Sequence, residues 1–216
     1  MRESMVTLFD EIGRCVGEVS CWGGKNPKFR RPVVLPCKQK PDVMIVTEQM
    51  NVRKEWRKNP EVIPAAWDPS IELLSVIKEV KEDKRRKDSG IIPKIDELFN
   101  GRFLEDFDTE NMSFRKFYWT HFIKCPGNLR NSNFGRNAPK LNICADKLLL
   151  KEIKVLNPQV IVSMGGHAST WILRKTGYPH EWIDMLWEEA ERVIIKEYLI
   201  PERGIVECGC KAKIIV

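Results

Sequence analysis

The sequence contains 216 residues, of which 43% are hydrophobic and 31% are charged, a composition typical of a globular protein and not of a disordered one. No apolar run approaches the roughly 20 residues of a membrane helix, and the acidic N-terminus "MRESMVTLFDEIG" has no apolar signal-peptide core. The net charge of +6 permits a polyanionic partner without requiring one. We therefore expect one cytoplasmic domain over residues 1–216, monomeric and without membrane contact.

The N-terminal residues 1–40 are expected to be irregular and cysteine-bearing, apart from a short helix near 7–16. Four apolar runs follow, each typical of a strand buried on both faces. They lie near residues 42–47, 117–123, 159–164 and 212–216.

Helical patterns separate these apolar runs. An insertion of about 52–112 divides the first two runs, and within it residues 70–82 and 89–103 favour helices. Residues 141–157 and 167–177 also favour helices, which close at Asn157-Pro158 and at Gly177. The basic stretch "KEVKEDKRRK" at 78–87 is typical of a solvated helix face. Alternating strands and helices predict an α/β fold, a three-layer α/β/α domain with a four-stranded parallel sheet.

Polar and glycine residues gather where these strands end. Glu48 ends the first strand, the loop 124–130 follows the second, and Gly165-Gly166 follows the third. In an open parallel sheet the ligand site lies beyond the carboxyl ends of the strands. The sequence therefore predicts a site at this edge.

The segment "THFIKCPGNLR", followed by "ICADKLLLKEIKVLNPQVIVSMGGHA", resembles sequences of the uracil-DNA glycosylase superfamily, specifically those of its iron–sulfur-containing prokaryotic branch. In that branch a strand ends in Asn-x-x-Lys-Cys-Arg-Pro. A second cysteine then opens a helix leading to Leu-x-Pro-x-x-Ile-Val-x-x-Gly. The resemblance covers about residues 10–216 and is clearest over 117–168. It implies a DNA-binding hydrolase of base excision repair that flips a deaminated base such as uracil out of the duplex.

The resemblance also implies roles for residues at the carboxyl edge. The strand's last polar residue reads the base; here it is His121, where the family has asparagine. Histidine matches a uracil edge only in part, so base specificity could differ from uracil. DNA phosphates would be held by a set of cations and helix-opening amides, namely Lys124, Arg130, Gly165, Gly166 and His167. The alternative for Lys124 and Arg130 is that both are solvent-exposed cations of a loop. The alternative for the two histidines is an ordinary structural role.

The seven cysteines leave metal binding, redox chemistry and ordinary burial as competing interpretations. The resemblance implies a four-iron cluster (4Fe-4S) with four cysteine ligands, a set that suits thiolates from separate segments. The matching positions are Cys15, Cys21, Cys125 and Cys144. The family has Cys-x-x-Cys at the front, whereas "CVGEVSC" has five intervening residues, so Cys37 is a possible substitute. Zinc is a weaker option.

Glu48 is the predicted catalytic residue. The family's first strand ends in Gly-Glu-Ala-Pro-Gly and places a polar group near the water that attacks the sugar; "VTEQMN" keeps the carboxylate and lacks the glycines and proline. The alternative is that Glu48 caps a helix or pairs with a lysine.

A family His-Pro-Ser triplet, expected after the last strand, is not among the 216 residues, which stop within "AKIIV". Such a histidine stabilises the departing base, and its loss costs on the order of a hundredfold in rate. If the chain ends at Val216, and no other group such as His167 takes this role, we expect it to bind DNA and to release base poorly or not at all. Alternatives to an active glycosylase are a catalytically impaired DNA-binding module with a structural cluster, and a plain scaffold domain.

Overall fold

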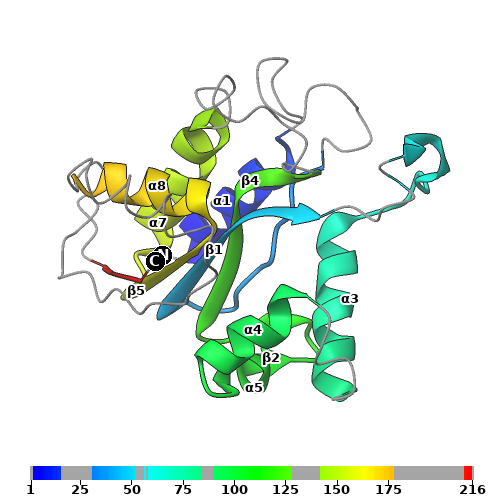
Figure 1. Cartoon of the computed structure of the whole chain (residues 1–216), viewed down its shortest axis with the longest axis horizontal. Helices are drawn as coiled ribbons and strands as arrows, with labels where there is room; N and C mark the ends of the chain where they lie inside the picture. Colours follow the sequence, from blue (N-terminus) through cyan, green and yellow to red (C-terminus); the bar gives the residue numbers. More distant parts are fainter. Residues whose placement is uncertain are drawn as a thin grey trace.

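A computed structural model describes residues 2–15, 31–51, 56, 58–83, 90–127, 142–177 and 212–215. Its central sheet has four parallel strands in the order β4-β1-β5-β6 (Figure 1). These strands are β1 (Val43–Asn51), β4 (Phe117–Gly127), β5 (Val160–Met164) and β6 (Lys213–Ile215). The predicted α/β fold with a four-stranded parallel sheet is confirmed.

The connection from β1 to β4 covers one face of the sheet. It contains η3 (Pro60–Val62), α3 (Pro69–Glu82), α4 (Ile91–Leu98), α5 (Arg102–Asp106) and a small antiparallel pair, β2 (Phe107–Asp108) with β3 (Ser113–Phe114). Asp68 starts α3 by accepting hydrogen bonds from two backbone N–H groups of its first turn. Phe103 and Trp119 lie in the apolar cluster that joins these helices to the sheet.

The opposite face is covered by α1 (Arg2–Gly13), η6 (Ala145–Leu149), α7 (Leu150–Leu156) and α8 (Gly166–Lys175). These elements bury a second apolar cluster against the sheet, which includes Ile12, Phe122 and Trp171. Helices on both faces give the three layers that the sequence predicts (Figure 1). None of the described helices combines the length and the apolar composition needed to cross a membrane.

Several boundaries differ from the sequence predictions. Strand β1 runs to Asn51, past the predicted end near residue 47. The helix expected near 7–16 spans Arg2–Gly13 and closes at a glycine, a poor helix former. Strand β4 runs to Gly127, beyond the predicted end near residue 123, and it keeps pairing with β1 up to Asn51. The sequence prediction ended the strand at a charge, Lys124, yet that side chain is buried in the sheet.

Candidate functional site

The connections from neighbouring strands cross the sheet in opposite directions on the two sides of the gap between β1 and β5. From β1 the chain crosses to β4 on one side, and it then returns past β1 to β5 on the other. Thr47 of β1 is level with Met164, the last residue of β5, so Glu48 and Gly165 come next along the two strands. In open α/β sheets ligands bind at this kind of switch point. The predicted catalytic residue therefore lies where the fold places ligand sites.

Glu48 and the turn before α8 fit together closely. The Oε1 atom of Glu48 accepts a hydrogen bond of 3.1 Å from the backbone N–H of His167, in the first turn of α8. Gly165 has a φ of +104°, and a Cβ atom there would lie 2.4 Å from Cγ of Glu48. Only glycine tolerates both conditions. The structure thus brings Glu48, Gly165, Gly166 and His167 together, as the sequence predicts.

This contact changes the expected role of the α8 N-terminus. The His167 N–H, one of the amides predicted to hold a DNA phosphate, instead binds the carboxylate of Glu48. A carboxylate is favoured there by the partial positive charge of a helix N-terminus. Burial lowers the pKa of the His167 imidazole to about 4, so this side chain is neutral at pH 7. The capping role weighed as an alternative for Glu48 is present in the structure.

His121 lies within β4 and not at its end. It is level with Thr47, so the two side chains share a face of the sheet, and the next residue, Glu48, faces α8 on the opposite side. The imidazole is only 1% exposed and stacks on Trp119 at 5.7 Å. Burial, with the nearby charge of Lys124, lowers its pKa to about 3.

The buried position of His121 affects its predicted role. Its Nδ1 atom is buried without a hydrogen-bond partner, which is unusual for a buried polar atom. Glu48 and His121, both predicted to act at the carboxyl edge, lie on opposite faces of the sheet and do not line one cleft. A flipped base can reach His121 only after the residues that bury it move apart.

Lys124 is not a phosphate contact, and that prediction is wrong. Its side chain is 1% exposed, and its ammonium binds the carboxylate of Glu152 and the hydroxyl of Thr120. Tyr118 completes the network by donating to Glu152 Oε1 at 2.5 Å. Alternation in β4 directs Tyr118, Thr120 and Lys124 to one face of the sheet, against α7.

Sequence reasoning missed Glu152, although a signal exists. It lies between Leu148 and Leu156 at helical spacing on a buried stripe, where a lone charge requires a partner.

Three of the four predicted cluster cysteines are described. The Sγ atom of Cys144 accepts a hydrogen bond of 3.4 Å from the backbone N–H of Lys124, the residue before the buried Cys125. Cys15 and Cys144 pack against the same apolar cluster. Burial raises the pKa of Cys144 to about 11, and the nearby Cys15 contributes to this shift. Cys21, and the predicted phosphate contact Arg130, lie outside the described residues.

These observations bear on metal binding in two ways. Within the described part of the chain, no three His, Cys, Asp or Glu side chains form a group arranged to hold a metal ion. The N–H···S bond to Cys144, however, is the type of contact that protein backbones make to cluster thiolates.

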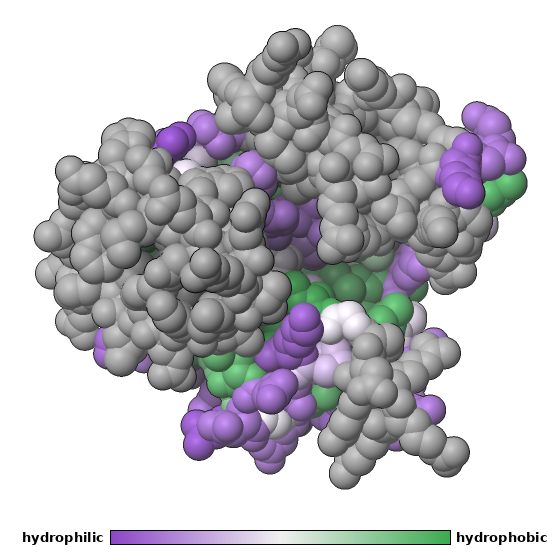
Figure 2. All heavy atoms as spheres, viewed as in Figure 1, coloured by the Kyte–Doolittle hydropathy of each residue, from purple (hydrophilic) through white to green (hydrophobic). Residues whose placement is uncertain are grey.

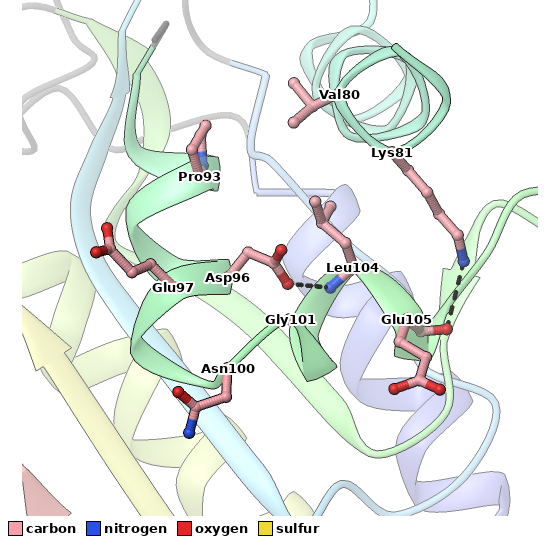
Figure 3. A pocket seen from close by; sticks show the side chains of 9 residues that line it. All are labelled: Val80, Lys81, Pro93, Asp96, Glu97, Asn100, Gly101, Leu104 and Glu105. Carbon is pink, nitrogen blue, oxygen red and sulfur yellow. Dashed lines mark hydrogen bonds between the residues drawn. The ribbon is translucent and has the colours of Figure 1, made fainter. Parts of the chain in front are cut away.

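A cavity of about 830 Å³ lies elsewhere, between α3, α4 and α5 (Figure 3). Its charged groups support the fold: Asp96 Oδ1 accepts from the N–H of Leu104 at 2.9 Å, and the Lys81 ammonium donates to two backbone carbonyls. None of the predicted site residues lines this cavity.

Comparison with known proteins adds no assignment: no family model matches the chain, and no curated protein matches it.

Proposed function

We propose that the chain is a DNA glycosylase-like protein of base excision repair, which hydrolyses the bond between a flipped deaminated base, such as uracil, and its sugar. The observation that carries the proposal is the position of Glu48, a partly exposed carboxylate at the switch point of a parallel sheet, held against the first turn of α8. Ligands of open α/β sheets bind at this place. The sequence resemblance supplies the substrate class.

In the proposed reaction Glu48 orients a water molecule toward the anomeric carbon of the sugar. The water oxygen forms a bond to that carbon, and the base leaves with the electron pair of the glycosidic bond. The proton of the water passes to the carboxylate. The bond from the His167 N–H fixes the Glu48 carboxylate in place, so the attacking water meets an oriented group. His121 would read the base after its surroundings open.

The iron–sulfur cluster belongs to the proposal as a structural group. Cys15, Cys21, Cys125 and Cys144 would hold it, and the backbone N–H of Lys124 would donate to one of its thiolates. When bound, a cluster of this type cross-links the segments that supply its ligands. A purified protein that is brown, with a broad visible absorption bleached by reductant, would support this assignment.

The substitution Glu48→Gln tests the catalytic role. The glutamine Oε1 can still accept the His167 N–H, so the cap of α8 is kept while the ability to take a proton is lost. If the unchanged protein releases uracil from a uracil-containing duplex, we expect this release to fall by about a hundredfold or more in the variant, with nearly unchanged DNA affinity. Glu110→Gln is the matched control, because Glu110 is an exposed carboxylate outside the site. Equal release by the Glu48→Gln variant and the unchanged protein would refute the role of Glu48.

A second candidate function is a DNA-binding module that keeps the cluster and has lost the chemistry. The observation that favours it is the buried state of His121, together with the use of Glu48 as a helix cap. Such a module binds DNA with an affinity that falls steeply with salt, and it releases no base. Measuring binding and base release on the same uracil-containing oligonucleotide separates the two functions.

A further inference from the structure

A small aromatic lobe, Trp56 with residues 58–68, follows β1 and projects from its carboxyl end before the chain enters α3 (Figure 1). Trp67 and Ile63 are buried here, yet neither belongs to the two apolar clusters that flank the sheet. Trp56 packs edge-on against Trp67, with ring centroids 5.2 Å apart and an interplanar angle of 77°. The lobe therefore has a small aromatic core of its own, separate from the two apolar clusters that flank the sheet.

Hydrogen bonds hold this lobe in a defined position. The guanidinium of Arg31 donates to the backbone carbonyls of Ala65 and Trp67, and the Trp67 indole N–H donates to Glu72 of α3. Asp68 accepts hydrogen bonds from two N–H groups of α3, so the carboxylates of Asp68 and Glu72 both have hydrogen-bond partners within the protein. These contacts fix Trp67, the ring against which Trp56 packs, to Arg31 and to α3.

The outer surface of the lobe combines aromatic, apolar and cationic groups. Trp56 is partly exposed, Lys58 is exposed, and Val62 is 53% exposed. Hydrophilic and hydrophobic atoms lie side by side where this part of the chain projects (Figure 2). In the sequence Trp56 lies within "RKEWRK", which has four cations and one acid, a net +3 in a chain of net +6. Glu61 is an exposed acid of the same lobe.

We propose that the lobe is a stacking platform for single-stranded nucleic acid, with a base on the Trp56 indole and neighbouring phosphates at Lys58. Non-specific single-strand binders combine these two features, cations along the backbone and an aromatic ring under the bases. The platform follows β1 in the chain, eight residues after Glu48, and would hold the nucleic-acid strand on the carboxyl side of β1. The inference rests on the proposed DNA function and adds a residue that contacts the unpaired strand.

The binding partner follows from the chemistry of the surface. An acidic protein would also be attracted by the cations, but it has no planar base to stack on an indole. A nucleic acid uses both features. An oligonucleotide without bases, which keeps the phosphates alone, therefore distinguishes stacking from charge attraction.

The test compares the binding of a 20-residue oligothymidine and of an abasic strand of equal length, by fluorescence anisotropy. We expect Trp56→Ala to weaken oligothymidine binding about tenfold and Trp56→Phe to weaken it about threefold or less, because phenylalanine keeps a stacking ring. Abasic-strand binding should be equal in all three proteins. Oligothymidine should quench the tryptophan fluorescence of the unchanged protein, and Trp56→Phe should lose most of that quenching whatever happens to the folding of the alanine variant.

Charge is tested with a matched pair of exposed lysines. Lys58→Gln should reduce the slope of log affinity against log salt by about 0.7, the value for one phosphate contact on a single strand, whereas Lys94→Gln on α4 should leave the slope unchanged. Oligothymidine affinity equal to that of the unchanged protein in both Trp56 variants would overturn the inference, as would equal loss with the abasic strand.

The stacking platform and the proposed glycosylase function can fail independently of each other. Trp56-dependent binding without any uracil release would sink the glycosylase reaction and leave the platform intact. Uracil release with Trp56-independent binding would do the reverse.

Discussion

Replacing Gly165 by alanine tests the geometry of the candidate site. Gly165 has a φ of +104°, and an added Cβ would lie 2.4 Å from Cγ and 2.8 Å from Oε1 of Glu48. The backbone conformation costs roughly 1–3 kcal/mol for a residue other than glycine. The steric conflict also forces Glu48 away from the His167 N–H, and losing a helix cap costs about 0.5–2 kcal/mol. We expect Gly165→Ala to reduce the free energy of unfolding by about 2–5 kcal/mol.

Two other glycines separate these contributions. Gly177 also has a positive φ, +73°, but a Cβ there would meet nothing within 4 Å, so Gly177→Ala reports the backbone cost alone. Gly13 lies in open space at the end of α1 and has no positive φ, so Gly13→Ala should be neutral or slightly stabilising. Urea unfolding of the three variants, with midpoints compared at equal slope, gives the differences.

A double-mutant cycle with Glu48→Ala isolates the contact itself. Glu48→Ala alone removes the cap and should cost about 0.5–2 kcal/mol. In the double variant the cap is lost only once and the steric conflict is absent. The combined loss should therefore be smaller than the sum of the single losses by about 0.5–2 kcal/mol. Additive losses, or a Gly165→Ala variant no less stable than Gly177→Ala, would refute the close contact between Glu48 and the α8 turn.

Three further predictions concern buried ionisable groups. Lys124→Met should destabilise the fold by about 3–5 kcal/mol because it leaves Glu152 buried without its cation, whereas the double variant Lys124→Met/Glu152→Leu should regain most of that loss in urea unfolding. The pKa of His121 is about 3 in the fold against 6.5 ordinarily, so the unfolded chain binds the proton first on acidification. Stability should therefore fall from pH 6.5 downward, by up to about 1.4 kcal/mol per pH unit from this group, and His121→Gln should flatten that part of the pH profile; an unchanged profile would contradict its buried neutral state. Burial raises the pKa of Cys37 to about 12, so mass spectrometry after iodoacetamide treatment at pH 8 should find Cys37 unmodified until denaturant is added.

The fold was predictable because its determinants are local in the sequence. Each central strand is a short apolar run, and a run that is apolar on both faces is typical of a parallel sheet covered by helices on both sides. Boundaries were less predictable where a charge interrupts a run. Lys124 looks like the end of a strand, and only the distant Glu152, on a helix packed against the sheet, allows the strand to continue to Gly127. A partner 28 residues away leaves no mark beside the lysine itself.

The candidate site was predictable in position and less so in orientation. That Glu48, Gly165 and His167 meet follows from the rule that parallel strands end at a common edge. Which face each side chain takes depends on register, and one residue along a strand reverses it. Glu48 and His121 therefore lie on opposite faces of the sheet, although both were assigned to one cleft.

The geometry of the α8 N-terminus also decides between two predicted uses of one amide. The N–H of His167 binds either the carboxylate of Glu48 or a DNA phosphate, and the structure has the carboxylate there. A phosphate at this amide would displace Glu48 and would bring a second negative charge beside it, at the place where the proposed water is oriented. The catalytic role of Glu48 is therefore incompatible with phosphate binding at His167. If the protein is a glycosylase, its phosphate contacts must come from other groups, and Lys58, on the lobe that follows β1, is an exposed cation suited to this role.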